Sequence, residues 1–250
     1  YFIAYVLRYL LLSFSGLGLT FLVSQQRKIQ PEKSVEKDQI LREMRHSIVG
    51  AIPISIILTL VITMGALELN AIYFDLATFG WPWFFGQVLV LMVLTDIWFY
   101  FVHRIMHSKK VFKLTHKRHH LSTDPSPFAS NSVHPIEAFL DIGFLVLASF
   151  IIPLHPIAIF IVISLSAIWS AYGHLGYEIA PRFITKTWWG KYINYSTVHN
   201  QHHATFKYNF GYYTTVWDRL FGTLHPDADR LVQEKSSAPT SQASNREFLH

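Results

Sequence analysis

The sequence of 250 residues contains no cysteine and little charge. Without cysteine the chain cannot form disulfides, thiolate metal sites or iron–sulfur clusters, and it has no cysteine nucleophile. Only 15% of the residues are charged, whereas 51% are hydrophobic and 16% are aromatic. This balance is too apolar for an ordinary soluble domain and indicates a membrane protein with a substantial polar part. The chain begins with Tyr1 rather than methionine, so we expect the natural start to lie further upstream.

Long hydrophobic runs divide the chain. The runs 2–23, 48–67 and 81–102 each have about the 20 residues that a helix needs to cross a bilayer. A further apolar region, 138–172, is interrupted by the "PLHP" of Pro153–Pro156, which is typical of the tip of a helical hairpin. The arms of this hairpin are short for full spans, which leaves open whether they cross the membrane. The expected fold class is an all-α membrane protein.

The net charge of +5 is distributed between the apolar runs. Basic residues occur in 24–46, in 103–135 and from 176 onward, whereas 68–80 and the Pro153–Pro156 tip have none. The positive-inside rule therefore predicts that the three basic segments face the cytoplasm. Basic residues that alternate with membrane spans, rather than covering one soluble face, argue against a nucleic-acid partner.

The pattern predicts three parts of the chain. Residues 1–102 are expected to hold transmembrane helices joined by the basic linker 24–46. Residues 103–225 are expected to form a histidine-rich catalytic region that includes the hairpin 138–172. The polar tail 226–250, rich in serine, alanine and glutamine, is expected to be disordered.

Histidines are crowded into three short boxes. The boxes are "HRIMH" at 103–107, "HKRHH" at 116–120 and "HNQHH" at 199–203. Because residues i, i+3 and i+4 share one helix face, each box is expected to offer up to three nitrogens to one point. The eight histidines of the boxes are too many for one tetrahedral ion, which indicates two metals. They are His103, His107, His116, His119, His120, His199, His202 and His203.

Metal ligation also explains the charge crowding in the second box. Lys117 and Arg118 would repel protonated histidines, but histidines that ligate a metal are neutral. Imidazole suits iron, copper, nickel and zinc. The expected architecture is therefore a set of transmembrane helices with a cytoplasmic helical cap that holds a dimetal site.

Other polar residues near the boxes are weaker candidates. His134 in "NSVHPIE" and His174 in "YGHLGYE" are either further ligands or hydrogen-bonded structural histidines. Asp96, deep in an apolar run, either accepts a hydrogen bond from a ligand histidine or is satisfied by a neighbouring helix. Asn131 lies in a proline-punctuated loop after the second box, which is expected to cross the site. Asp96 and Asn131 are the two residues predicted to support catalysis.

The box pattern resembles the membrane-bound fatty acid hydroxylase/sterol desaturase superfamily. That superfamily has an H-x(3,4)-H box and two H-x-x-H-H boxes on a helical membrane scaffold. The segments "PSPFASNSVHPIEAFLD" and "YNFGYYTTVWDRLFGT" are similar to those of lathosterol oxidase-type sterol desaturases. The similarity covers roughly residues 85–225, while "HLGYE" around His174 departs from the pattern and weakens any assignment of substrate.

The resemblance implies an oxidoreductase with two iron ions that uses O2 to hydroxylate or desaturate a lipid. It carries over the eight box histidines as ligands and adds His134 and His174. The chain has no G-x-G-x-x-G fingerprint and no haem-attachment motif, so electrons are expected from an external cytochrome or ferredoxin type of donor. The expected partners are thus a lipid substrate, the membrane and this donor.

Two alternatives remain open from the sequence. One is a histidine-rich membrane protein that binds or transports metal without oxygenase activity. Transporters place polar residues at the bilayer midplane, whereas these boxes lie beyond the apolar runs, which argues against transport. The other alternative is a catalytically inactive relative, against which the intact boxes argue.

Overall fold

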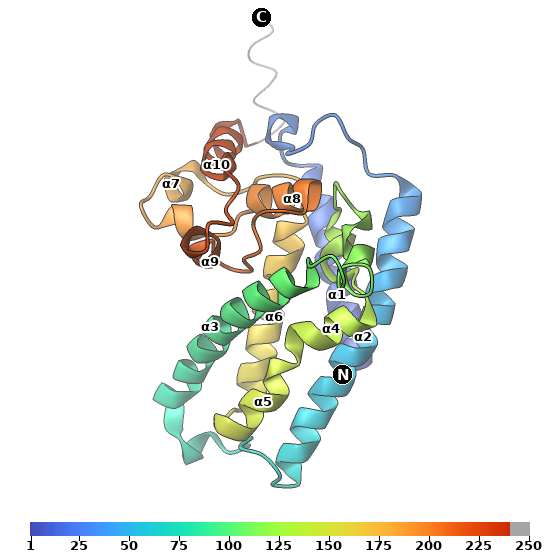
Figure 1. The fold of residues 1–250 in the computed structure, drawn as a ribbon. Coiled ribbons are helices and arrows are strands. Elements are labelled where there is room, and N and C mark those ends of the chain that lie inside the picture. Colours follow the sequence, from blue (N-terminus) through green and yellow to red (C-terminus); the bar gives the residue numbers. More distant parts are fainter. Residues whose placement is uncertain (241–250) are drawn as a thin grey trace, which may run out of the picture.

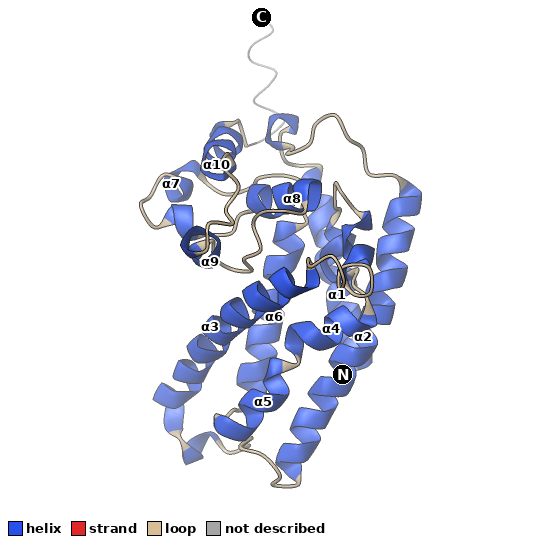
Figure 2. Ribbon diagram, in the orientation of Figure 1, coloured by secondary structure: helices blue, strands red, loops and turns tan. Residues whose placement is uncertain are grey.

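The computed structural model describes residues 1–240. Within these residues the chain is helical and forms no named strand, as the sequence predicts (Figure 1, Figure 2). The long helices form an elongated bundle, and the short helices of the C-terminal part gather at one end of it (Figure 1). The helices are α1 (Phe2–Thr20), α2 (Lys37–Ala66), α3 (Gly80–Met106), α4 (Pro135–Ile142), α5 (Phe144–Ile151), α6 (Pro156–Gly173), α7 (Arg182–Thr185), α8 (Ser196–Thr205), α9 (Val216–Leu220) and α10 (Ala228–Ser237). Short 3-10 helices are η1 (Gln25–Arg27), η2 (Leu76–Thr78), η3 (His116–Leu121), η4 (Pro127–Asn131) and η5 (Gly190–Tyr192).

Four helices of the described part are long and apolar enough to cross a membrane, namely α1, α2, α3 and α6. The three predicted spans fall within α1, α2 and α3 apart from a few terminal residues. The fourth span is the second arm of the predicted hairpin, because α6 continues for 18 residues beyond the proline break. The first arm is divided at Gly143 into the short helices α4 and α5, so only one arm has the length of a span.

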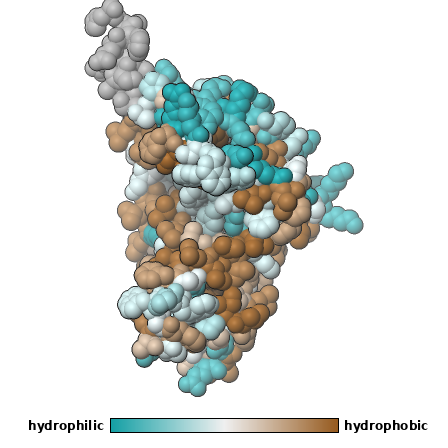
Figure 3. Space-filling view, turned by 90° about the vertical axis from the view of Figure 1, so that its left-hand side faces the viewer, coloured by the Kyte–Doolittle hydropathy of each residue, from teal (hydrophilic) through white to brown (hydrophobic). Residues whose placement is uncertain are grey.

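Large apolar side chains on the outer faces of the spans are exposed. Leu7 and Leu11 of α1, Ile56 of α2 and Leu89 of α3 are each more than half exposed. Figure 3 shows apolar residues covering the body of the molecule, while hydrophilic residues gather over the end that carries the short helices. An apolar surface of this extent is stable in contact with lipid, not water. The chain is an integral membrane protein.

Helix α2 is longer than its predicted span. It begins at Lys37, within the segment predicted as a basic linker, and runs without interruption to Ala66. Residues 37–46 remain helical because they pack inward through Glu43, which accepts hydrogen bonds from Gln39 (2.8 Å) and Ser126. The linker between the first two spans is therefore confined to about residues 21–36.

The two loops without basic residues meet at one end of the bundle. The amide of Ala71 donates to Ser149 (2.7 Å), and the amide of Tyr73 donates to Leu154 (3.1 Å). At the opposite end the amide of Ile29 donates to Gly176 (3.0 Å). We call this second end, which carries η3 and α8, the histidine end. The loops without basic residues therefore lie at one end of the bundle, and basic segments lie at the other end, as the charge pattern predicts.

The expected disorder of the tail is wrong for its first part. Residues 228–237 form α10, which packs against α7 and α8. Its Ala228 and Val232 are buried in a small core with Tyr195 and Val198 of the α8 region. This apolar pair, spaced by four residues, gives α10 a packed face that the polar composition obscures. Residues 241–250 lie outside the described residues.

Candidate metal centre

The histidines of the boxes converge into two groups at the histidine end. In each group the nitrogen atoms that face one another lie within 4.8 Å. The five-histidine group consists of His103, His107, His116, His120 and His202. The four-histidine group consists of His119, His174, His199 and His203. Each of the two separate groups could hold one metal ion.

The two H-x-x-H-H boxes are divided between the groups, which corrects the expectation that each box serves one point. In η3, His119 joins the four-histidine group while His120 joins the other. In α8, His202 and His203 separate in the same way. Consecutive side chains point about 100° apart on an α-helix and about 120° apart on a 3-10 helix. Adjacent histidines therefore cannot reach the same point, and each box bridges both groups.

Hydrogen bonds on the outer nitrogens orient the rings of the five-histidine group. Nδ1 of His103 lies 2.9 Å from the carbonyl oxygen of Phe210, and Nδ1 of His116 lies 2.6 Å from Oε1 of Glu137. A carbonyl oxygen or a carboxylate only accepts, so each Nδ1 carries the hydrogen. The Nε2 atoms of these neutral rings then expose lone pairs, and they face each other at 2.9 Å. Two lone pairs at this distance repel unless a cation lies between them.

The four-histidine group is built in the same way. Nδ1 of His174 lies 2.7 Å from the carbonyl oxygen of Ser170, and Nδ1 of His203 lies 2.9 Å from that of Ser122. The Nε2 atoms of both rings lie 3.2 Å from Nε2 of His199. Carbonyl acceptors outside and converging lone pairs inside are the arrangement that metal-ligating histidines have in proteins. The donor set of both groups therefore fits metal ions.

Burial keeps these histidines neutral. It lowers the pKa of His116 and of His202 to about 3 and that of His174 to about 4. Burial likewise lowers the pKa of His119, with the neighbouring histidines adding repulsion to its charged form. Neutral imidazole is the form that binds metal. Lys117, in contrast, is exposed, and Arg118 is half-buried.

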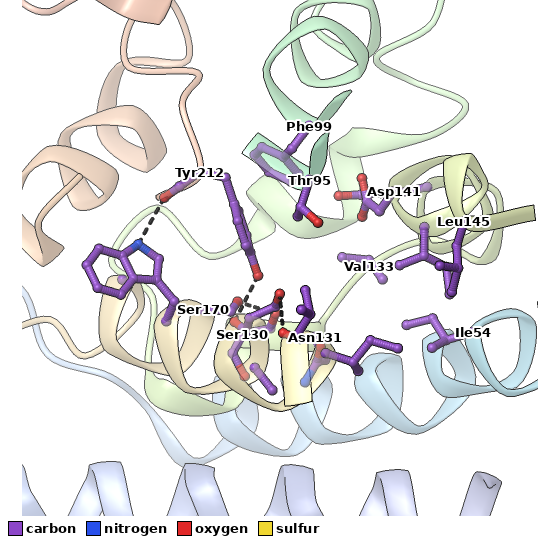
Figure 4. Close-up of a pocket in the computed structure, with 18 of the residues that line it drawn as sticks. Ile54, Thr95, Phe99, Ser130, Asn131, Val133, Asp141, Leu145, Ser170 and Tyr212 are labelled. Atoms are coloured by element: carbon purple, nitrogen blue, oxygen red, sulfur yellow. Dashed lines mark hydrogen bonds between the residues drawn. The ribbon is translucent and has the colours of Figure 1, made fainter. Parts of the chain in front are cut away.

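A cavity reaches from the histidines into the bundle. Figure 4 shows part of its wall. The space between its lining atoms, which includes some open solvent, is about 1220 Å³, and its wall is largely apolar. At the histidine end it is lined by His116, His119, His174 and His199, three of which belong to the four-histidine group. Farther along, the spans and α5 contribute Ile54, Leu91, Leu145, Ile159 and Val162. The cavity therefore joins the candidate metal centre to the membrane-spanning part.

Sequence comparison places this architecture in a known family. The family model described as fatty acid hydroxylase matches residues 88–223, which is more than half of the chain and includes every histidine of both groups. The chain belongs to the fatty acid hydroxylase family. This confirms the resemblance to the fatty acid hydroxylase/sterol desaturase superfamily that the boxes indicate.

Relatives of this fatty acid hydroxylase family member include proteins named for sterol oxidation. The chain is 33% identical to lathosterol oxidase of Homo sapiens over 190 residues, 75% of this chain and 62% of the human protein. It is 29% identical to the probable Delta(7)-sterol 5(6)-desaturase of Neurospora crassa over 228 residues, 90% of this chain and 63% of that protein. The chain thus spans less than two thirds of the length of these relatives. No solved structure matches it.

The two additional histidines of this family member separate in the structure. His174 lies in the four-histidine group, whereas His134 is in neither group. Nδ1 of His134 accepts the amide hydrogen of Ile136 at the start of α4, so the ring caps this helix. Gly173, the residue before His174, makes room for the ring of His199, because a Cβ at this position would lie 3.2 Å from Cδ2 of His199. Nine of the ten predicted ligands are thus brought together.

Asp96 does not contact a histidine ring through any hydrogen bond of the described residues. Its carboxylate accepts hydrogen bonds from the amide of Tyr213 (2.7 Å), the hydroxyl of Thr214 (2.6 Å) and the indole of Trp217 (3.1 Å). The alternative of a carboxylate satisfied by a neighbouring segment is therefore what the structure shows. Asp96 ties α3 to the segment that follows the third box, and its predicted catalytic role would have to act through this segment.

Asn131 lies on the wall of the cavity, where its Oδ1 accepts a hydrogen bond from the hydroxyl of Tyr5 (2.8 Å). Two more polar groups of α1 hold the same loop by binding carbonyl oxygens of η4. These bonds join Tyr9 to Phe128 (3.0 Å) and Ser13 to Pro127 (3.2 Å). The expected loop after the second box thus runs along the site, and α1 fixes it there. The role of Asn131 in catalysis stays a prediction.

Glu137 is the residue that sequence reasoning missed. It is buried (2% exposed) and holds His116 through Oε1, the contact that was expected from Asp96. Its other oxygen, Oε2, is buried without a hydrogen-bond partner among the described residues. The signal was present in "HPIEAFLD", where two carboxylates interrupt an apolar stretch at a spacing of four residues.

Proposed function

We propose that the protein is a di-iron oxidoreductase that uses O2 to hydroxylate or desaturate a C–H bond of a membrane lipid. The observation that carries this proposal is the junction of two buried histidine groups with an apolar cavity between membrane spans. An amphiphile can enter such a cavity from the bilayer without crossing water. The names of the relatives, lathosterol oxidase and Delta(7)-sterol 5(6)-desaturase, support a sterol or a related lipid as substrate, with a fatty acyl chain as the other candidate.

The ligand sets support two iron ions, one in each group. Imidazole nitrogens suit iron as well as copper, nickel and zinc, and the family membership favours iron. When bound, the iron pair supplies the binding and reduction of O2 and the oxidising power to cleave an aliphatic C–H bond. The protein contributes the neutral imidazoles, the acceptors on their outer nitrogens and a buried site from which bulk water is excluded.

The overall reactions balance with an external reductant. Hydroxylation converts R–H, O2, two electrons and two protons into R–OH and water. Desaturation takes the same O2, electrons and protons, removes two hydrogens from adjacent carbons and yields a C=C bond and two waters. Since the chain has no nucleotide or haem motif, we infer that the electrons come from a cytochrome or ferredoxin type of donor.

We further propose that the histidine end faces the cytoplasm. Two of the basic segments, 24–46 and 103–135, lie at this end, while the loops at the other end have no lysine or arginine. The positive-inside rule assigns such an end to the cytoplasm. Its positive charge suits an acidic electron donor and also anionic lipid headgroups.

The test is iron reconstitution and turnover of protein purified in mild detergent. Elemental analysis should give roughly two irons per chain, as expected for two imidazole sites. With iron, a chemical reductant and O2, lathosterol should yield a product whose mass is higher by one oxygen or lower by two hydrogens. His119→Ala and His202→Ala, one from each group, should each lose iron and all turnover.

Two results would contradict the proposal. If the folded protein binds no metal, the histidines of the two groups are not metal ligands. Protein loaded with two irons that oxidises neither a sterol nor a fatty acyl lipid would exclude the oxidoreductase and favour a metal-binding protein without oxygenase activity.

A further inference from the structure

We propose that α7, η5 and α9 form a lipid-binding surface that lies in the headgroup layer of the bilayer and binds anionic headgroups. We call it the flank surface, and it consists of residues 182–192 and 216–221. None of these residues lines the cavity or belongs to a histidine group. The flank surface is therefore separate from the proposed site of oxidation.

Large apolar side chains are exposed along the flank surface. In its first segment they are Phe183 (76% exposed), Trp188 (80% exposed) and Trp189, and in its second they are Val216, Leu220 and Phe221. Among the described residues, α10 at the same end of the molecule exposes no large apolar side chain. Exposed aromatic rings that gather on one side of a polar end indicate a surface that another molecule covers.

The two tryptophans of the flank surface have free indole N–H groups. Within residues 1–240, neither Trp188 nor Trp189 donates a hydrogen bond from its indole, whereas Trp169 donates to a carbonyl oxygen (3.0 Å). An indole prefers the membrane–water interface, where its apolar body contacts acyl chains and its N–H reaches water or a headgroup. Both exposed indoles fit this layer.

Positive charge accompanies these rings. Residues 182–192 include Arg182, Lys186 and Lys191, which are all exposed, and they include no acidic residue. Basic side chains at a membrane surface are attracted to anionic lipids, whose headgroups carry the opposite charge. Aromatic rings together with cations are the composition of segments that lie in the membrane interface.

The flank surface continues the lipid-facing side of α3. The ring centre of Phe221 lies 5.6 Å from that of Tyr100 and 5.6 Å from that of Phe101. Phe101 is itself exposed, as is Ile105 one turn later. The lipid that covers these side chains of α3 therefore meets α9 directly.

Hydrogen bonds fix η5 to α9 and extend the same surface to the tryptophans. The guanidinium of Arg219 donates to the carbonyl oxygen of Lys191 (2.7 Å), and the amide of Thr215 donates to that of Tyr192 (2.8 Å). The two tryptophans directly precede η5. Their rings are thus held beside the lipid-facing end of α3.

The flank surface lies at the edge of the hydrocarbon layer. Helix α6 has 18 residues and rises roughly 27 Å, close to the 30 Å or so of hydrocarbon in a bilayer. Trp169, near its end, donates to the carbonyl oxygen of Tyr212, and α9 begins at Val216. Figure 1 shows α7 and α9 at this end of the bundle, with α10 farther from the spans. Figure 3 looks onto this side and shows apolar residues extending from the body into the hydrophilic end.

The bilayer, not a second protein, is the occupant that these contacts select. A protein on the flank surface would have to displace the lipid that covers Phe101 and Ile105 of α3. The phosphate groups of lipids also supply acceptors for both the free indoles and the basic side chains. Lipid bound there fastens the end of the molecule that carries α8 to the membrane.

The test measures how deeply fluorescent labels lie in protein reconstituted into lipid nanodiscs. Because the sequence has no cysteine, one introduced cysteine takes the only label. Phe183→Cys and Leu220→Cys place labels on the flank surface, whereas Leu89→Cys labels the lipid-facing side of α3 and Glu234→Cys labels α10. Quenching by iodide measures contact with water, and quenching by a lipid with a nitroxide on its headgroup measures contact with the headgroup layer.

The labels on the flank surface should be quenched by the nitroxide lipid and should lose most of the iodide quenching seen in Glu234→Cys. The label of Leu89→Cys should resist iodide. With Trp188→Ser and Trp189→Ser added, the label of Phe183→Cys should shift toward the result of Glu234→Cys, because the rings that enter the interface are lost. The changed side chains are exposed, so these variants should fold as the wild type does.

Nanodiscs of phosphatidylcholine, with and without phosphatidylserine, test the role of charge. Phosphatidylserine should increase the lipid quenching of the Phe183→Cys label, and Lys186→Gln with Lys191→Gln should abolish this increase. Arg230→Gln is the control, because it removes an exposed positive charge from α10 instead. It should leave the increase unchanged.

Two results would overturn the proposal. If the labels of Phe183→Cys and Leu220→Cys respond to iodide as that of Glu234→Cys does, the flank surface faces water and is open to a protein partner. If phosphatidylserine leaves the lipid quenching unchanged, or if the two lysine substitutions leave the increase intact, the flank surface does not bind anionic headgroups. These measurements require no turnover, so either result leaves the proposed oxidation unaffected.

Discussion

The five-histidine group and the four-histidine group use the same sequence boxes but differ in their surroundings. In the five-histidine group His107 is half-buried and the other four rings are buried. Of these five histidines only His116 lines the cavity. The four-histidine group is fully buried, and His119, His174 and His199 line the cavity. One group therefore has more ligands, and the other has more contact with the substrate space.

This difference indicates a division of roles. Metal sites that do chemistry keep a coordination position free for a reactant, whereas saturated sites are mainly structural or supporting. The group with fewer histidines is also the one that faces the cavity, so we expect the reacting carbon to approach it.

The largest effect is expected from removing one ligand of each group in parallel. His199→Ala leaves three histidines in its group, of which His119 and His174 line the cavity, and should lower the iron content from roughly two to one per chain, with loss of turnover. His107→Ala removes only the half-buried ring and leaves the four buried histidines of its group, so it should retain most of its iron, unlike His202→Ala, which removes a buried ring. Iron analysis of both purified variants checks this. Equal iron loss in the two variants, or a larger loss in His107→Ala, would show that the groups do not differ in ligand redundancy.

A smaller effect is expected from the carboxylate that orients only one group. Glu137→Leu removes the acceptor from Nδ1 of His116 and should weaken metal binding in the five-histidine group about 10- to 100-fold, as loss of such acceptors does in other metal sites. A chelator titration that follows both irons should show one phase shifted and the other unchanged.

Asp96→Asn is the matched control for Glu137→Leu, because Asp96 is also a buried carboxylate but binds the segment 213–217 instead of a ring. Its folded protein should release iron as the wild type does. If both phases shift in Glu137→Leu, or if Asp96→Asn shifts either phase, the assignment of Glu137 to one group is wrong.

The smallest effect on metal is expected at the opposite end of the bundle. His155 caps α6 by accepting the amide hydrogen of Ile157 (3.2 Å) and packs against Tyr73 and Phe84. His155→Ala should leave the iron content unchanged and cost about 1 kcal/mol, typical of a lost helix cap. For a chain of this size that lowers the Tm by about 2–4 °C, measurable by thermal unfolding. Loss of iron in this variant would contradict the placement of the metal centre at the histidine end.

Much of the scaffold and most of the site were predictable from local patterns. Apolar runs of sufficient length gave the spans in α1, α2 and α3, because a bilayer requires a fixed length of helix. The spacing of the boxes indicated clustered ligands, and nine of the ten predicted histidines lie in the two groups. The polar composition of the tail led to a wrong prediction of disorder for α10. The packing of Val232 in this helix depends on a partner that composition does not reveal.

The sequence by itself determined that this is a membrane protein with a histidine-rich site, because residue type and short-range spacing are sufficient for both conclusions. Only the tertiary structure decided how the histidines are shared, since neighbours on a helix point in different directions and the second contributor to each group comes from a distant segment. It also decided that Glu137, not Asp96, holds a ring. These assignments depend on contacts between α3, η3, α4, α6 and α8, which spacing along the chain does not encode.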